Sequence, residues 1–193
     1  MIDFKDVEGV PVKYAHDWVA EPDEAFAILW NELDWVRHPG VPRREYYVNT
    51  LGVDYTYGQK EFARTYRSQP MDWLIQCLLE DLETETGTKF EAIFLNGYDD
   101  EKDQLGWHSD NSPEMDDSRP IAIVSLGAER EIWFRNWNAD PEITVTRLKL
   151  GHGSLCLMEA GMQDTHQHRI PKGDRPHGPR LSLTFRGYVP NES

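Results

Sequence analysis

His108 and Asp110 are the residues of this chain whose types and spacing point most directly to chemistry. One residue separates them, so in an extended segment both side chains leave the backbone on the same face and converge. Far along the chain, His166 and His168 offer a second source of imidazole. Two histidines and one carboxylate on a β scaffold form the ligand set of non-haem Fe(II) oxygenases, which keep coordination positions open. Alone, the His-x-Asp pair is weak evidence, because surface hydrogen-bonding pairs have the same pattern.

A second group of polar residues lies in segment 180–186, which alternates strictly between polar and apolar side chains. Its polar face carries Arg180, Ser182, Thr184 and Arg186. At a rise of ~3.3 Å per residue the two arginines are about 20 Å apart, so they address opposite ends of a site. A guanidinium is the preferred bidentate partner of a carboxylate, so one arginine could anchor a dicarboxylate. Asn96 and Tyr98 share a strand face in the same way, whereas the alternative for the arginines is pairing with surface acids.

Helices and strands must position these residues. Apolar residues at helical spacing predict helices over 25–33, with Pro22 in a first-turn position, and over 71–82. From about residue 89 onward, shorter periods predict strands at Phe90–Tyr98, Ile121–Leu126, Glu131–Trp137, Ile143–Leu150, Ser154–Met158 and Arg180–Val189. This order favours a mostly β fold, a β-sandwich or jelly roll with helices on one side. The polar segment 99–117 is expected to be a long functional loop.

Composition limits the classes of protein that fit. The 193 residues, 39% hydrophobic and 28% charged, predict one folded domain over 1–193. The net charge of −14 argues against binding nucleic acid or anionic membrane by bulk charge. No apolar run approaches the ~20 residues of a membrane helix and no signal peptide is recognisable, so we expect an intracellular protein, cytoplasmic or nuclear. Cys77, on a helical face with Trp73, and Cys156 are expected to be small buried hydrophobes.

Taken together, the motifs resemble the AlkB family of Fe(II)/2-oxoglutarate dioxygenases, which repair alkylated nucleobases. The motifs in chain order are Asn96-x-Tyr98, His108-x-Asp110, His168-Arg-Ile-Pro-Lys172 and Arg180-Leu-Ser-Leu-Thr-Phe-Arg186. The resemblance covers about residues 42–190, and its specificity comes from the order and spacing of all four motifs. It implies an α+β fold with a double-stranded β-helix (jelly-roll) core over 89–190, and helices with a nucleotide-recognition lid over 1–88.

The resemblance also implies which residues hold the cofactors. Iron would be held by His108, Asp110 and His168, with His166 as a neighbour and as the alternative to His168. The co-substrate 2-oxoglutarate would be held by Asn96, Tyr98, Arg180, Ser182 and Arg186. Arg180 would bind the distal carboxylate and Arg186 would lie nearer the metal. Ser182 stands where relatives usually have Asn, and it can still donate a hydrogen bond.

Residues 42–58 resemble the family's lid over a flipped base. A base taken out of its stack regains stacking on an aromatic ring, although packing within a sheet also explains aromatic residues here. Tyr57 is the first choice for a stacking residue and Trp107 the second, with Tyr55 beside them.

The residues that follow Asp110 depart from the family pattern. Base-repair members commonly place acids there that read exocyclic amines or substrate charge, whereas this chain has Asn111 and Ser112. Asn111 is therefore the expected substrate contact at this point, and Glu114 is a nearby acid that could substitute.

The resemblance implies oxidative demethylation of N-alkylated bases in DNA or RNA, a repair of alkylation damage that consumes 2-oxoglutarate and O₂ and releases formaldehyde. The expected partner is single-stranded or base-flipped nucleic acid, bound by a monomer at the lid side and the C-terminal arginine strand, with no membrane involved. Two alternatives stay open. One is an Fe(II)/2-oxoglutarate hydroxylase of a protein side chain or small metabolite, although residues 37–67 hold six Lys and Arg against three acids. The other is a non-catalytic, cupin-like metal-binding jelly roll, which would give the arginines no role.

Overall fold

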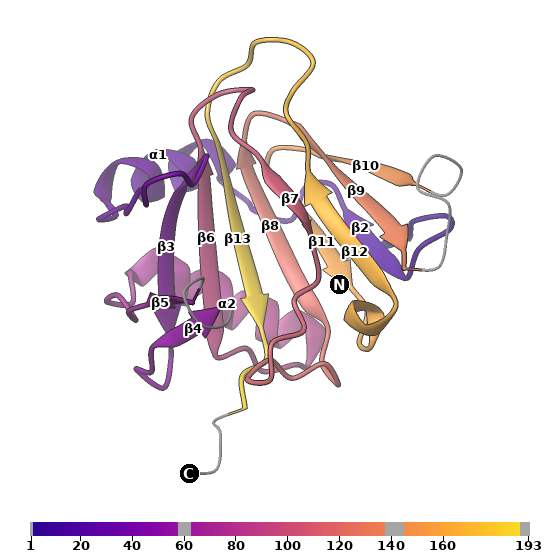
Figure 1. The fold of residues 1–193 in the computed structure, drawn as a ribbon, viewed down its shortest axis with the longest axis horizontal. Helices are drawn as coiled ribbons and strands as arrows, with labels where there is room; N and C mark the ends of the chain where they lie inside the picture. The colour runs from indigo at the N-terminus through magenta and orange to yellow at the C-terminus, as the bar shows by residue number, and fades with distance from the viewer. Residues whose placement is uncertain (1, 58–62, 138–144, 190–193) are drawn as a thin grey trace.

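The computed structural model describes residues 2–57, 63–137 and 145–189, which form two main sheets and one hairpin (Figure 1). In spatial order, the seven-stranded sheet contains β1 (Lys5–Asp6), β2 (Val12–Ala15), β11 (Ser154–Met158), β8 (Ile121–Gly127), β13 (Arg180–Arg186), β6 (Ala92–Tyr98) and β3 (Arg44–Asn49). The four-stranded sheet contains β10 (Thr146–Leu150), β9 (Arg130–Asn136), β12 (His166–Ile170) and β7 (Leu105–His108). The hairpin pairs β4 (Tyr55–Tyr57) with β5 (Arg64–Tyr66).

The described strands pair antiparallel, and from β6 onward the chain crosses repeatedly between the two main sheets. β6, β8, β11 and β13 belong to the larger sheet, while β7, β9, β10 and β12 belong to the smaller one. Figure 1 shows the smaller sheet lying across the larger one. This arrangement is a jelly roll, so the expected mostly β fold with flanking helices is confirmed.

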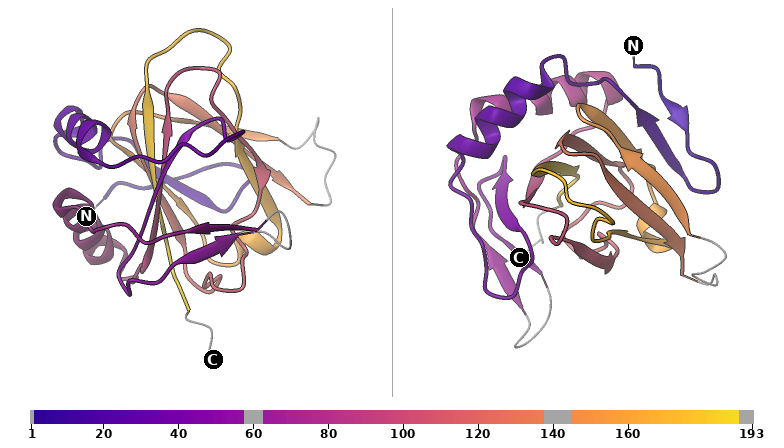
Figure 2. Two further views of the ribbon diagram at one scale, coloured as in Figure 1. Left: turned by 60° about the vertical axis from the view of Figure 1, so that its left-hand side comes forward. Right: turned by 90° about the horizontal axis from the view of Figure 1, so that it is seen from above.

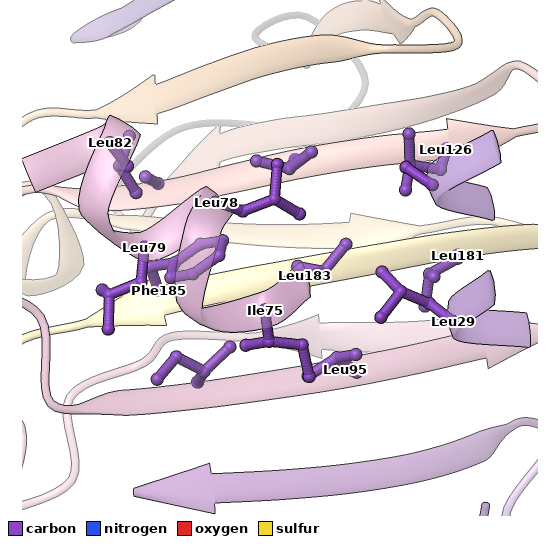
Figure 3. Packing of buried hydrophobic residues seen from close by; sticks show 14 of the residues in the cluster. Leu29, Ile75, Leu78, Leu79, Leu82, Leu95, Leu126, Leu181, Leu183 and Phe185 are labelled. Atoms are coloured by element: carbon purple, nitrogen blue, oxygen red, sulfur yellow. The ribbon is translucent and has the colours of Figure 1, made fainter. Parts of the chain in front are cut away.

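Two helices cover the outer face of the larger sheet, on the side away from the smaller sheet (Figure 2). They are α1 (Pro22–Glu32) and α2 (Trp73–Thr86). The carboxylate of Asp72 caps α2 by accepting the backbone N–H of Leu74 at 2.8 Å, and Gly87 ends the helix at φ 67°. Figure 3 shows the apolar face of α2 packed on β6 and β13, with Ile75, Leu78, Leu79 and Leu82 above Leu95, Leu183 and Phe185.

The two cysteines have different environments. The expectation that Cys77 is buried is wrong: α2 buries Ile75, Leu78 and Leu82, which turns Cys77 and the 60% exposed Trp73 to the other side of the helix. Cys156 is buried between the sheets as expected, and burial raises the pKa of its thiol to about 12. Neither helix has the length and apolar character needed to cross a membrane, within the described residues.

Two expectations about strands need correction. The loop expected over residues 99–117 is interrupted by β7, whose half-exposed residues do not show a clean alternation. Strands β1 to β5 all precede residue 89, where no strand was predicted, because they are short or, like β3, buried on both faces. The strand predicted at 143–150 begins at Thr146, and residues 143–144 lie outside the described part of the chain.

Strand β13 separates the apolar core from the polar interior of the sandwich. Leu181, Leu183 and Phe185 point to the helices. Because side chains alternate along a strand, Arg180 and its polar companions point toward the space between the sheets. The polar face of this segment is therefore an inner surface rather than a solvent-exposed one.

Candidate active site

His108, Asp110 and His168 meet at the end of the smaller sheet. His108 on β7 lies directly opposite His168 on β12 in the strand register, and Asp110 follows two residues beyond β7. The Nε2 atom of His108 is 3.6 Å from Oδ1 of Asp110, and Nε2 of His168 is 3.7 Å from Oδ2. The three ligand atoms all lie within 4.8 Å of one another. Neighbouring strands thus bring residues about sixty positions apart in the sequence to one point.

The chemistry of this donor set fits a divalent metal ion. Oδ2 of Asp110 is buried without a hydrogen-bond partner among the described residues. Burial lowers the pKa of His108 and lowers that of His168 to about 3, so both imidazoles are neutral and keep a lone pair. Burial is the largest single effect on Asp110 and would raise its pKa, but Arg186, His108 and His168 together outweigh burial, so the net shift of this pKa is downward. Two neutral histidines and one carboxylate are the facial triad of non-haem iron sites.

Surrounding groups fix the orientation of the three side chains. Nδ1 of His108 lies 2.9 Å from the carbonyl oxygen of Gly106. A carbonyl oxygen only accepts hydrogen bonds, so Nδ1 carries the proton and the unprotonated Nε2 can bind a metal. The backbone N–H of Asp110 donates to Oε1 of Gln163 at 2.9 Å, and Nη2 of Arg186 lies 3.0 Å from Oδ1 of Asp110. Gln163 sits in the short helix η2 (Met162–Asp164) and carries no motif that would have identified it from the sequence.

His166 is near the triad without joining it. Its ring nitrogen Nδ1 lies 2.8 Å from the hydroxyl of Thr165, and its carbonyl oxygen accepts the hydroxyl of Ser109 at 2.8 Å. The ligand cluster contains His168 and not His166. Of the two histidines offered by the sequence, the geometry therefore favours His168.

Arg180 provides a second, separate binding group at the other end of β13. Its side chain is 0% exposed, and its Nε donates to the hydroxyl of Ser125 at 3.0 Å. Nη1 and Nη2 have no hydrogen-bond partner among the described residues. Burial lowers the pKa of Arg180 to about 10, so the group stays a cation at neutral pH. A buried cation with two free nitrogen atoms fits a carboxylate ligand that is bidentate.

The remaining expected co-substrate residues lie between these two points. Register places Tyr98 opposite Arg180 and Asn96 opposite Ser182 on the neighbouring strands β6 and β13. The guanidinium carbon of Arg180 is 5.2 Å from the centre of the Tyr98 ring. Asn96, Tyr98 and Ser182 are all buried. The inner face of β6 and β13, from the metal ligands to Arg180, therefore carries hydrogen-bonding side chains along its length and a cation at the end far from the metal ligands.

A cavity of about 110 Å³ opens beside the triad and beneath the β4–β5 hairpin. Its lining consists of Arg43, Tyr55, Tyr57, Tyr66, Phe94, Asn96, Leu105, His108, Asp110 and Arg186. Tyr55 is buried and its hydroxyl lies 2.6 Å from that of Ser112, whereas Tyr57 is 51% exposed at the cavity mouth. The sequence did not identify Arg43 and Tyr66 as wall residues, although clusters of Arg and Tyr in the lid segment were a signal.

Two expected substrate residues lie elsewhere. Trp107 is on the opposite face of β7 from His108, where Arg135 and Arg169 stack on its ring at 4.4 and 5.0 Å, so it does not line the cavity. Alternation along the strand makes this outcome unavoidable once His108 points inward. Asn111 is exposed and Glu114 is not among the lining residues either.

The fold and the site define a class of protein: a jelly roll with a two-histidine, one-carboxylate metal site and a buried arginine suited to a dicarboxylate. Comparisons with known proteins agree with this class. Residues 11–186 match the family model of the 2OG-Fe(II) oxygenase superfamily. The chain belongs to this superfamily. Membership implies Fe(II), 2-oxoglutarate and O₂, and the donors described above fit these groups.

Individual relatives lie in the AlkB group, which confirms the resemblance found in the sequence. The chain is 30% identical over 201 residues to the human alpha-ketoglutarate-dependent dioxygenase alkB homolog 3, covering 94% of this chain and 64% of that protein. It is 29% identical to the mouse DNA oxidative demethylase ALKBH2, covering 90% of this chain and 77% of that one. The solved structure of OsALKBH1 is similar in fold, with a TM-score of 0.64, 14% identity and coverage of 96% of this chain and 100% of the other. The chain spans about three-fifths of the length of the alkB homolog 3 proteins that it matches.

Proposed function

We propose that this chain is an Fe(II)/2-oxoglutarate-dependent dioxygenase that removes N-linked alkyl groups from bases of DNA or RNA. The observation that carries the proposal is the arrangement of β12, β7 and β13. It places a three-ligand metal cluster near Arg186 and a buried guanidinium at Arg180 whose two Nη atoms have no hydrogen-bond partner among the described residues. A non-catalytic metal-binding module would leave Arg180 as an unexplained buried cation, which is costly.

Different residues of the site would hold the metal and the co-substrate. When bound, iron, 2-oxoglutarate and O₂ supply the oxidation of a carbon–hydrogen bond of the alkyl group. His108, Asp110 and His168 would hold the metal, and Arg180 would fix the far carboxylate of the co-substrate. The Oδ1 atom of Asn96 accepts a hydrogen bond from Nε of Arg43 at 2.7 Å. The amide N–H groups of Asn96 therefore stay available to donate to the co-substrate. Loss of the hydroxylated methyl group as formaldehyde needs no general base, and none is assigned.

The substrate half of the proposal is supported by the lid. Tyr57 is half-exposed and lines the same cavity as the metal ligands His108 and Asp110, where a flipped base could stack on its ring. The names of the curated relatives point the same way, since one is called a DNA oxidative demethylase.

The outer face of the smaller sheet supports a polymeric, anionic partner. There arginine and tryptophan alternate: Arg169 and Arg147 each lie 4.2 Å from the ring of Trp133. Interleaved cations and aromatic rings are typical of surfaces that bind nucleic acid. This face replaces the C-terminal arginine strand as the expected contact, because Arg180 is fully buried and cannot meet a polymer. A monomer that binds a single strand or a flipped base remains part of the proposal.

The proposal is tested by incubating the protein with Fe(II), 2-oxoglutarate and single-stranded oligonucleotides that each carry one N-methylated base. Mass spectrometry measures demethylated oligonucleotide, succinate and formaldehyde. We expect all three products, and their loss in His108→Ala. Succinate formation without any change in the oligonucleotides would favour a hydroxylase of another substrate, and no succinate at all would favour a binding module.

A further inference from the structure

Arg43 lies in the wall of the cavity lined by His108 and Asp110, and two of its donors are already engaged. Its Nε donates to Oδ1 of Asn96 and its Nη2 to Oε1 of Glu45, both at 2.7 Å. A guanidinium carries five N–H donors, so donors remain after these two bonds. Arg43 shares the cavity wall with Tyr57 and His108, so the remaining donors can meet a base held under the lid.

The charges in this wall are already balanced in pairs. Arg186 is 3.0 Å from Asp110, and Arg43 is 2.7 Å from Glu45. Among the described residues, which exclude 58–62, Asp110 is the only carboxylate that lines the cavity. Asn111, the residue after Asp110, is exposed and does not line the cavity. The described wall therefore offers N–H donors and phenol groups but no spare carboxylate for a positively charged base.

Glu45 does not fill this gap. It is 1% exposed, and its Oε1 pairs with Arg43. Its Oε2 has the cation of Arg64 at 3.7 Å but no hydrogen-bond partner among the described residues. It lines a different cavity, of about 270 Å³, which shares Tyr66 with the first. Its effect on the substrate cavity is exerted through Arg43, which it holds in place.

We propose that the cavity prefers neutral alkylated bases with a carbonyl oxygen, such as N3-methylthymine and N1-methylguanine, and that Arg43 donates a hydrogen bond to that oxygen. This inference rests on the proposed base demethylation and names its substrate class. A cationic base would lie in a partly buried wall whose only carboxylate among the described residues, Asp110, is already paired with Arg186, so no carboxylate there would be left to offset its charge. N1-methyladenine is cationic and lacks a carbonyl, whereas N3-methylcytosine is cationic but keeps a carbonyl at C2. The expected order is therefore neutral bases first, N3-methylcytosine next and N1-methyladenine last.

The first test compares these four bases in single-stranded DNA oligonucleotides of otherwise identical sequence. With the wild-type chain we expect kcat/KM for the neutral bases to exceed that for N1-methyladenine by about tenfold or more, since a site built to hydrogen-bond a group rejects a ligand that lacks it. Faster turnover of the cationic bases would overturn the inference while leaving base demethylation intact. Consumption of 2-oxoglutarate without repair of any of the four would overturn the proposed function, and the inference with it.

The second test assigns the preference to Arg43. The variant Arg43→Met is made together with Glu45→Gln, so that no buried carboxylate loses its partner, and it is compared with Glu45→Gln alone. We expect the ratio of kcat/KM between N3-methylthymine and N1-methyladenine to fall by about tenfold. An equal loss on both bases, with a raised KM for 2-oxoglutarate, would show that Arg43 only positions Asn96 and would overturn its assignment.

Arg44→Met is the matched control for Arg43. Arg44 is the next residue on the chain, but its guanidinium lies 4.7 Å from the ring of Trp30 and pairs with Asp99 at 2.8 Å, away from the cavity. Its replacement should leave the ratio unchanged, and a shift as large as that of the Arg43 variant would contradict a specific role for Arg43. The wild-type comparison stands on its own if a variant does not fold.

Discussion

Arg180 and His108 carry the two ends of the proposed site, and each has a distinct physical signature. Arg180 is a fully buried cation whose Nη groups have no partner among the described residues, and His108 is a partly buried imidazole whose Nε2 faces Asp110. Groups of this kind are costly in a folded protein unless a ligand completes them. Their cost is the reason to expect a metal and a dicarboxylate rather than a purely structural role.

At His108, replacement by alanine should remove one of three metal ligands and abolish metal-dependent succinate formation. Metal retention after desalting is the direct measurement, and thermal unfolding shows whether the fold is kept. His166→Ala is the matched control, because His166 lies two residues from His168 but outside the ligand cluster. Full metal binding in His108→Ala, or its loss in His166→Ala, would contradict the assignment.

At Arg180, replacement by alanine should raise the KM for 2-oxoglutarate with little direct effect on metal binding. A charge-assisted hydrogen bond contributes about 2 kcal/mol, so an increase of roughly thirtyfold is expected. Arg180→Lys keeps the charge but not the bidentate geometry and should recover part of the loss. An unchanged KM in Arg180→Ala would remove this arginine from the co-substrate site.

At the scale of elements, the strands β13 and β7 show which features of the site the sequence could predict and which it could not. The alternation of residues 180–186 predicted both faces of β13, and the spacing of His108 and Asp110 predicted that they converge. Trp107 was misplaced because stacking ability says nothing about which face of β7 a residue occupies. The contacts of Arg43 with Asn96 and of Gln163 with Asp110 each join residues 53 positions apart in the sequence. Glu45 is a buried acid that belongs to no recognisable motif. Only the tertiary structure could identify these three residues.

The lid hairpin should act through Tyr57. Replacing Tyr57 by alanine should weaken binding of a methylated oligonucleotide by about 1 to 3 kcal/mol, the contribution of one base stacked on an aromatic ring. Fluorescence anisotropy with labelled oligonucleotide measures this loss. Trp73→Ala is the control, because Trp73 is also an exposed aromatic residue but lies on α2, on the outer face of the larger sheet. An equal loss of oligonucleotide binding in both variants, or no loss in Tyr57→Ala, would show that Tyr57 does not stack on the base and only packs within the protein.

At the scale of the whole molecule, the net charge of −14 does not exclude a nucleic-acid partner but restricts where it binds. Thirteen acids lie in residues 80–117, whereas the outer face of the smaller sheet carries Arg135, Arg147 and Arg169 among tryptophans. An acidic protein with one local basic surface should bind nucleic acid with modest affinity that falls as salt rises.

The basic surface can be tested by its salt dependence. Arg147→Gln with Arg169→Gln should weaken oligonucleotide binding and reduce the slope of log K against log salt by about 1 for each phosphate group that is no longer neutralised. Lys13→Gln is the control, since Lys13 is a cation of β2 that pairs with Asp6 and Glu159. An unchanged slope in the double variant would move the nucleic-acid interface to another face.

The central claim is that this site couples turnover of 2-oxoglutarate to removal of an N-alkyl group from a base. The most direct measurement is the ratio of succinate, formaldehyde and repaired oligonucleotide in one reaction with an N-methylated single strand. We predict that formaldehyde and repaired base form in equal amounts, that succinate accompanies them, and that all three disappear in His108→Ala. Succinate production that is indifferent to every methylated oligonucleotide, with no repaired base, would contradict this claim.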